Sequence, residues 1–382
     1  MRLLLTCTEL GLGHVNRIIP LGKKLQKRGH ELYFISGGVA YQLLKKEFEN
    51  VYSCTPISWY ESPRGIMPSI SLLNILLPLP WYDCKHRKLK LKASNSKETV
   101  RRYYDLRKHV PKLRPDLVIS DGDMISLRLG NKWKIPSIYI TNIIRPTYRF
   151  PALLTPGERF TERYVKKCAK IIVPDTQKYT ICEYNLGNLD ELGIREKVEF
   201  VGTFSDMHAC KYEGGSEKHI FASISGPTGT KAKLARTIIP VLSSLESKSI
   251  VSLGEPDNKN TKRLSNCEVH GWLNKNQRRE FMKNAKIVIF SGGHGTCYEV
   301  IKHKKPSICM PTQPEQMGNA RKLDELSCSI YVENKRQIKL AIEKIEGNIE
   351  FYKNNVQRLS EYSSRFNGLD GAVTVVENTL QS

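Results

Sequence analysis

Side chains that suit phosphates and sugars gather in the stretch SGGHGTCYEVIKHKKPSICMPTQPEQMGNA, which covers residues 291–320. Gly292, Gly293 and Gly295 follow the apolar run KIVIF, which predicts a buried strand, and they precede TCYEVIKH, which has a helical pattern. A helix that begins after a strand offers unpaired backbone N–H groups and the positive end of its dipole to an anion. Glycines let a phosphate approach that backbone. The loop is therefore a candidate phosphate site.

Polar side chains that suit hydroxyl groups follow this loop. Thr296 offers a hydroxyl, and Glu299, about one helical turn further, is placed to accept both hydroxyls of a ribose. Glu315, Gln316 and Asn319 follow the next predicted strand, and carboxylate and amide groups together suit a sugar. A glycine-rich turn needed only for geometry would explain the loop but not this sequel. A nucleotide-sugar offers phosphate, ribose and sugar at once.

Alternating strands and helices must position these groups. LLLTC, ELYFIS, DLVIS and PSIYIT predict strands in the first half, with a helix over 16–28, and IFASIS, SIVSL, KIVIF and PSICMP predict strands in the second. The alternation predicts an α/β fold with parallel sheets, and 382 residues exceed the usual single core. We expect a first domain over 1–206, a junction near 207–216, a second domain over 217–350, and a helical segment over 351–382 that packs back across both.

These features resemble the UDP-glycosyltransferases of the GT-B fold. Their donor motif reads His-x-Gly-x-x-Ser/Thr-x-x-Glu, then a Gly-x-Pro strand, then Asp/Glu-Gln and Asn-Ala. VHGWLNKNQ resembles the family's segment beside the uracil, and ISGPTGTK resembles its first phosphate-facing loop. The resemblance implies two Rossmann-like domains that face each other across a cleft, with the donor on the second.

One position departs from the family pattern. The family's phosphate-contacting histidine aligns with Ser291, and His294 follows three residues later. The donor-binding residues that the resemblance implies are Thr228, Gly229, Trp272, Leu273, Ser291, Gly292, Gly293, His294, Gly295, Thr296, Glu299, Glu315, Gln316 and Asn319.

The segment CTELGLGHVNRIIPLGKKLQKRGHELYFIS is similar to the amino-terminal segment of the same family, including the bacterial enzymes that add GlcNAc to a lipid-linked peptidoglycan precursor. The resemblance implies that His14 is the catalytic base and that Gly13, His14 and Asn16 face the acceptor. Imidazole titrates near neutral pH, as a base for a sugar hydroxyl requires. Asp121, after a predicted strand, is expected to hold the imidazole and stabilise its charged form. A capping or packing role is the alternative for both residues.

The tripeptide DGD at residues 121–123 permits a second interpretation. In metal-dependent GT-A transferases a DxD motif holds Mn²⁺ or Mg²⁺ on the donor diphosphate. Short matches of this kind arise by chance, and the donor motif already supplies a helix terminus for the phosphate. We therefore expect no metal and no cofactor apart from the UDP-sugar co-substrate. Inactivation by EDTA with rescue by Mn²⁺ would reverse this expectation.

The acceptor side is expected over residues 66–114. The apolar, proline-broken run IMPSISLLNILLPLPWYD precedes a basic segment, and residues 85–114 hold twelve Lys and Arg against Glu98 and Asp105. An apolar wedge with a basic flank is typical of an element that lies on anionic lipid. A core segment followed by a solvated basic helix is the alternative. The resemblance favours lipid, because lipid-linked acceptors are held by the amino-terminal half in this family.

Composition and charge limit the classes of partner that the protein is expected to bind. The chain carries 60 Lys and Arg against 38 Asp and Glu, a net charge of +22, which favours anionic partners. The basic residues are not interleaved with aromatics, so we expect no specific nucleic acid, and no obligatory protein partner. Ten cysteines form no CxxC pair, which indicates a reduced compartment. No run approaches the ~20 apolar residues of a membrane span, and MRLLLTC is too short for a signal peptide. We expect a cytoplasmic protein, peripheral on the cytosolic face of the cell membrane.

The sequence thus predicts an inverting, metal-independent glycosyltransferase. It would move a hexose or N-acetylhexosamine, with GlcNAc favoured, from a UDP-sugar to a polyprenyl phosphate or diphosphate acceptor. The alternatives are a UDP-sugar 2-epimerase of the same fold, which needs no acceptor, and a transferase that acts on a soluble acceptor.

Overall fold

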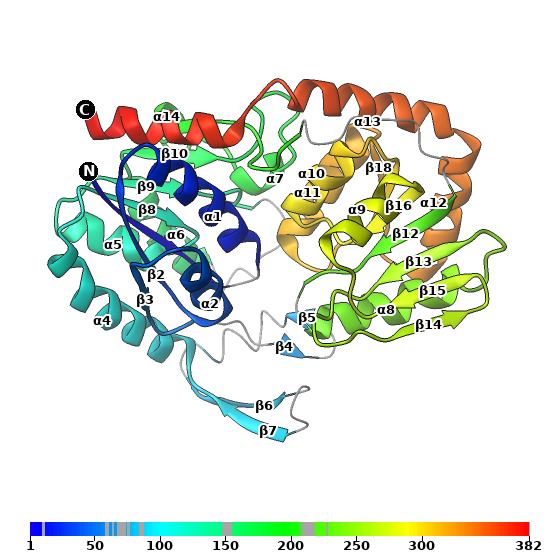
Figure 1. Cartoon of the computed structure of the whole chain (residues 1–382), viewed down its shortest axis with the longest axis horizontal. Helices are drawn as coiled ribbons and strands as arrows, with labels where there is room; N and C mark the ends of the chain where they lie inside the picture. The colour runs from blue at the N-terminus through cyan, green and yellow to red at the C-terminus, as the bar shows by residue number, and fades with distance from the viewer. Residues whose placement is uncertain are drawn as a thin grey trace.

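The predicted strands of the first half assemble into one parallel sheet of seven strands, seen on the left in Figure 1. They are β1 (Arg2–Cys7), β2 (Glu31–Ser36), β3 (Val51–Ser53), β8 (Leu117–Asp121), β9 (Ser137–Ile140), β10 (Lys170–Val173) and β11 (Val198–Phe200). The spatial order is β11-β10-β9-β8-β1-β2-β3, so the winding direction reverses between β1 and β8. In open parallel sheets, ligands bind outside the carboxyl ends of the strands at such a reversal.

The second half repeats this plan in another seven-stranded sheet. Its strands are β12 (His219–Ser223), β13 (Ser249–Ser252), β14 (Thr261–Leu264), β15 (Cys267–His270), β16 (Ala285–Phe290), β17 (Ser307–Cys309) and β18 (Ser329–Tyr331). The order is β14-β15-β13-β12-β16-β17-β18, with β14 antiparallel to β15 and the other pairs parallel. The reversal lies between β12 and β16. Two Rossmann-like sheets confirm the predicted GT-B architecture.

Helices cover both sheets. In the first half they are α1 (Leu12–Lys27), α2 (Gly38–Glu47), α4 (Asn95–Leu113), α5 (Met124–Lys132), α6 (Thr155–Val165), α7 (Glu183–Leu186) and the short 3₁₀ helix η2 (Arg195–Lys197). In the second half they are α8 (Thr228–Leu242), α9 (Lys275–Lys283), α10 (His294–Lys302), α11 (Pro314–Glu325) and α12 (Lys335–Gly347). α1 begins four residues before the predicted start at residue 16, so His14 lies in the first helical turn rather than in a loop.

The last two helices connect the halves. α13 (Ile349–Ser363) packs beside α10 and α12, and α14 (Gly368–Gln381) returns to the first half, as the orange and red helices of Figure 1 show. Ala372, Val373 and Val376 of α14 are buried in the same apolar cluster as Leu3 and Leu5 of β1. The carboxyl-terminal segment therefore contributes to the core of the first domain.

Two small two-stranded sheets lie within, or just before, the segment expected to face a membrane. β4 (Glu61–Ser62) pairs with β5 (Gly65–Ile66), and β6 (Leu79–Asp83) pairs with β7 (Lys88–Lys92) as an antiparallel hairpin that projects from the body in Figure 1. α4 follows the hairpin and leads back to the first sheet.

The structure describes residues 1–9, 12–57, 61–62, 65–66, 74, 77–83, 88–146, 155–207, 218–226 and 228–381. Much of the apolar run after residue 66, and the junction apart from Met207, lie outside these residues. Within them, no helix combines the length and apolar character that a membrane crossing requires. The eight cysteines within them are all buried and unpaired.

Candidate active site

The predicted histidine and aspartate meet at the reversal point of the first sheet. β1 and β8 are neighbours, with Cys7 paired in register to Asp121, so the helix after β1 begins beside the end of β8. The Nδ1 atom of His14 lies 2.7 Å from Oδ1 of Asp121. Asp121 is fully buried, whereas the His14 side chain is 25% exposed. A carboxylate behind an accessible imidazole is the arrangement that base catalysis requires.

Arg17, which the sequence analysis did not single out, completes this cluster. Its Nε donates to Oδ2 of Asp121 at 2.8 Å and its Nη2 donates to Oδ1 at 2.6 Å. Burial raises the pKa of Asp121, but Arg17 and His14 outweigh burial, so the pKa of this carboxyl is held below its ordinary value. The carboxylate is therefore ionised at neutral pH. Arg17 lies three residues after His14, on the same face of α1, which is a signal that the sequence did contain.

Gly122, the residue after Asp121, lies close against the imidazole of His14. Gly122 has a φ of +74°, and a Cβ built on it would lie 2.8 Å from Cε1 of His14 and 2.8 Å from Cγ2 of Thr8. A side chain would therefore displace the ring, and the left-handed backbone favours glycine in any case. The glycine of the DGD tripeptide therefore leaves room for the His14 ring.

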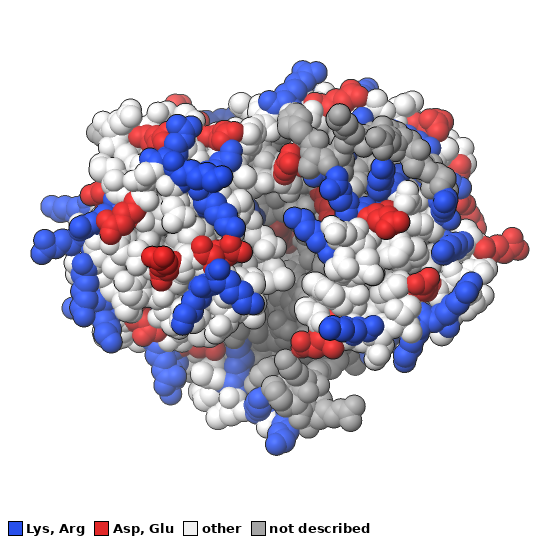
Figure 2. Space-filling model, in the orientation of Figure 1, with Lys and Arg blue, Asp and Glu red and all other residues white. Residues whose placement is uncertain are grey.

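A polar bridge links this cluster to the second domain. Nη1 of Arg17 lies 3.5 Å from Oδ1 of Asn142, and Nδ2 of Asn142 donates to Oε1 of Glu315 at 2.7 Å. Glu315 is in the first turn of α11, in the second domain. The face drawn in Figure 2 is hollowed between the two lobes. The residues predicted for base and for sugar binding therefore lie on opposite sides of one interdomain contact.

The glycine loop lies at the reversal point of the second sheet. The loop after β12 and the loop after β16 are joined there by Ser225 and Ser291, whose hydroxyls are 3.2 Å apart. A Cβ built on Gly293 or Gly295 would meet nothing within 4 Å, so the backbone at the start of α10 faces open space. Gly292, with a φ of +83°, is instead pressed against Cys309 and the Gln316 carbonyl. α8 begins at Thr228 and Gly229, so two helix N-termini lie at this reversal point.

Glu299 already has a partner. Arg278 of α9 donates from Nε to Oε1 at 3.0 Å and from Nη2 to Oε2 at 2.5 Å, while its Nη1 reaches the Ser223 hydroxyl at 2.6 Å. The carboxylate remains 30% exposed. Each oxygen has a further lone pair, so Arg278 orients Glu299 and leaves it able to accept ribose hydroxyls. Arg278 was not among the residues predicted from the sequence.

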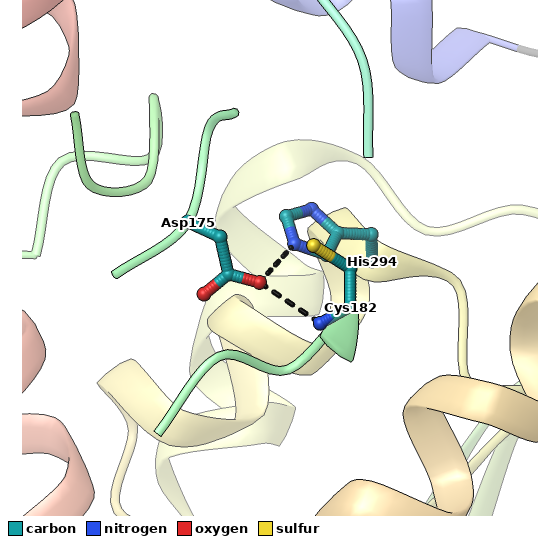
Figure 3. Close-up of side chains that lie close together, drawn as sticks. All are labelled: Asp175, Cys182 and His294. Carbon is teal, nitrogen blue, oxygen red and sulfur yellow. Dashed lines mark hydrogen bonds and ion pairs between the residues drawn. The ribbon is translucent and has the colours of Figure 1, made fainter. Parts of the chain in front are cut away.

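His294 corrects an expectation. Its ring does not point into the donor loop but reaches the first domain, where Nε2 lies 3.0 Å from Oδ2 of Asp175 (Figure 3). Asp175 also accepts from the Tyr298 hydroxyl and from the backbone N–H groups of Thr176 and Cys182. The side chain of His294 is buried by this interdomain contact, whereas its backbone still opens α10.

Three further donor predictions are corrected in part. Asn319 is fully buried, donates to the Gly292 carbonyl at 2.9 Å and accepts from Asn185 at 2.9 Å, so its amide joins the domains rather than facing a sugar. The Gln316 side-chain oxygen accepts from the backbone N–H and the hydroxyl of Thr312. Leu273 is packed in the core, whereas its neighbour Trp272 is 42% exposed and remains available to stack on a nucleobase.

The DGD carboxylates separate instead of converging. Asp121 pairs with Arg17, whereas Asp123 caps α5 and pairs with Arg102 at 2.9 Å. Arg102 is almost fully buried and also contacts Glu9 at 3.2 Å. Both aspartates therefore have cationic partners of their own. The described His, Cys, Asp and Glu that do converge closely enough for a metal ion are Asp175, Cys182 and His294, whose ligand atoms all lie within 4.8 Å of one another (Figure 3).

Comparisons with known proteins agree with this fold. Residues 232–373 match the model of the glycosyltransferase family 28 C-terminal domain. An uncharacterized glycosyltransferase of Methanosarcina acetivorans is 26% identical over 98% of this chain and 97% of its own. A UDP-N-acetylglucosamine–N-acetylmuramyl-(pentapeptide) pyrophosphoryl-undecaprenol N-acetylglucosamine transferase of Clostridium tetani is 22% identical over 96% of this chain and 94% of its own.

Solved structures show the same fold. Spinosyn rhamnosyltransferase SpnG, complexed with thymidine diphosphate, superposes with a TM-score of 0.68 at 14% identity, covering 99% of this chain and 100% of its own. Three findings agree. The chain has two Rossmann-like domains, its second half matches a family 28 domain, and it is similar to glycosyltransferases over its full length. The chain is therefore a glycosyltransferase of the GT-B fold, and its residues 232–373 are similar to the family 28 C-terminal domain.

Proposed function

We propose that this enzyme transfers a hexose or N-acetylhexosamine, with GlcNAc favoured, from a UDP-sugar to a lipid-linked acceptor, with inversion at the anomeric carbon. The acceptor is a polyprenyl phosphate or diphosphate, met at the cytosolic face of the membrane. The observation that carries the proposal is the accessible imidazole of His14, which is held by buried Asp121 and joined through Arg17 and Asn142 to the second domain.

The donor site is supported by the second reversal point. The N-termini of α8 and α10 and the open backbone at Gly293 and Gly295 offer N–H groups to a diphosphate. Glu299 suits the ribose, and Trp272 suits the uracil. In this proposal the charge that develops on UDP is stabilised by these helix ends and loop amides, with no metal ion.

The acceptor hydroxyl supplies the nucleophile. Nδ1 of His14 is hydrogen-bonded to the ionised carboxylate of Asp121. The neutral imidazole therefore carries its proton on Nδ1 and its free lone pair on Nε2. Nε2 takes the hydroxyl proton as the acceptor oxygen bonds to C1, and the bond from C1 to the UDP oxygen breaks with its electron pair on UDP. Attack from the face opposite UDP inverts the sugar carbon.

The projecting hairpin supports a lipid acceptor. Leu89 is 73% exposed and Leu91 is 70% exposed, and they alternate along β7 with exposed Lys88 and Lys90. Successive side chains of a strand point to opposite faces, so β7 presents one apolar and one cationic face. Bilayers with anionic headgroups accept both kinds of side chain.

α4 extends this surface. Val100 and Tyr104 are each more than half exposed and one turn apart, beside exposed Arg101 and Lys108. Arg102 and Lys92 are instead buried, so part of the basic run serves the fold.

The test supplies UDP-GlcNAc, UDP-glucose and UDP-galactose with a membrane lipid extract, and compares wild type with His14→Ala. We expect one glycolipid product from the wild type and none from the variant. Equal yields from both proteins would remove His14 from the mechanism. Product on a water-soluble acceptor alone would favour a soluble substrate.

A second incubation with UDP-GlcNAc and no acceptor separates transfer from epimerisation. A transferase leaves the sugar unchanged or releases it slowly, whereas a 2-epimerase forms a new UDP-sugar. Formation of such a product at a rate independent of lipid would overturn the proposal.

A further inference from the structure

The contacts of Arg17 conflict with a simple His–Asp pair. Its Nη2 lies 3.1 Å from Nδ1 of His14, while the same Nδ1 lies 2.7 Å from Oδ1 of Asp121. Arginine can only donate, and Nδ1 must also donate to the carboxylate. The approach of Arg17 to His14 is therefore not a hydrogen bond but the placement of a positive charge beside the imidazole.

The charges of Asp121 and Arg17 offset each other beside the His14 imidazole. Asp121 contributes one negative charge and is gripped bidentately by Arg17, whose side chain is only 14% exposed. In a Ser-His-Asp triad the carboxylate stabilises imidazolium. Here the guanidinium neutralises that carboxylate at close range, so the stabilisation of imidazolium is offset.

Other charged groups near the pair come from the elements around it. Glu315 of α11 and Tyr139 of β9 both act electrostatically on Arg17. Glu315 reaches it through Asn142, which bridges the two side chains. Burial raises the pKa of Tyr139 well above its ordinary value, so this phenol is neutral at working pH. The charged groups at this point thus include Asp121, Arg17 and the more distant Glu315, and Arg102 and Asp123 act on the neighbouring Cys7.

We infer that Arg17 is a positioning residue that neutralises Asp121 and thereby offsets the pull of that carboxylate on a proton at the proposed base, His14. The inference rests on the proposed role of His14. The effect of Arg17 on His14 can, however, be measured on the imidazole itself, without any substrate.

The experiment follows the ring Cε1–H signals of ¹³C-labelled histidine by NMR as a function of pH, with His14→Gln used to assign the His14 signal. In Arg17→Met the unshared charge of Asp121 favours imidazolium, so the His14 midpoint rises by about 1 pH unit or more. Arg17→Met/Asp121→Asn removes both charges and returns the midpoint to within about 0.5 unit of wild type. Arg28→Met, at an exposed position just beyond the same helix, leaves it unchanged.

Kinetics give a second readout. The acid limb of the kcat/KM profile moves to higher pH in Arg17→Met, and activity recovers in alkaline buffer, whereas a merely structural defect lowers the rate at every pH. Arg17→Gln serves if the Met variant does not fold.

A His14 midpoint in the Arg17 variant that is equal to or below that of wild type would overturn the inference. Absence of transfer by the wild type would instead count against the proposed function, and the NMR midpoint would still decide the role of Arg17.

Discussion

Glu299→Gln separates binding from stability at the donor site. The Glu299–Arg278 ion pair is partly exposed, 30% and 25% for the two side chains, so its loss should change the free energy of unfolding by no more than about 1 kcal/mol. The same carboxylate is expected to accept two ribose hydroxyls. Loss of its charge weakens those bonds by about 1.5–3 kcal/mol, which is roughly 10- to 150-fold in the Kd of UDP.

Titration calorimetry with UDP measures this effect, and urea unfolding measures stability in parallel. Glu325→Gln is the matched control, because Glu325 also pairs with an arginine, Arg321, on an exposed helix face away from the loop. Arg278→Met should weaken UDP binding less than Glu299→Gln, since the carboxylate remains but is no longer oriented. The reasoning is refuted if Glu299→Gln binds UDP as tightly as wild type, or if the control loses as much affinity.

Three further predictions concern other parts of the fold. Asp175→Asn should lower the free energy of unfolding by about 3–5 kcal/mol, because His294 and Tyr298 lose a fully buried anionic partner. The pKa of Asp175 is lowered below its ordinary value of 3.8, so its stabilisation is present above that pH and disappears as the pH falls through the lowered value. Wild type should therefore lose stability in acid more steeply than Asp175→Asn, and parallel acid unfolding curves would contradict this. Arg102→Met should cost about 3–5 kcal/mol in urea unfolding, because Asp123 stays buried without its cation; a loss below about 1 kcal/mol would count against the pairing. Leu89→Glu/Leu91→Glu should abolish sedimentation with vesicles rich in anionic lipid and leave stability unchanged, since both side chains are exposed; undiminished binding would place the lipid contact elsewhere.

The fold was predictable because strand and helix patterns report burial along the chain. Apolar runs marked the central strands of both sheets, and the reversal points then brought His14 to Asp121 and the glycine loop to the loop after β12. The order of neighbouring strands thus joins residues that are 107 and 66 positions apart in the chain.

Other features depended on contacts that no local pattern records. His294 lies in the donor loop, three residues after the position of the family's histidine, but its partner Asp175 is 119 residues away in the other domain. Arg102 belongs to a basic run that predicts a surface on anionic lipid or, as the alternative, in solvent, yet it is buried because Asp123 and Glu9 neutralise it. Arg17 could have been found, since an arginine one turn after a catalytic histidine shares its helix face.

The most direct test of the account is the single-turnover rate of sugar transfer by His14→Gln, measured beside its affinity for UDP. A general base supplies about 10²–10⁴ in rate, and His14 belongs to the domain opposite the helix ends that are proposed to hold the donor. The account predicts a loss of at least about 100-fold in rate with the UDP affinity unchanged. A variant that transfers sugar at the wild-type rate would contradict it.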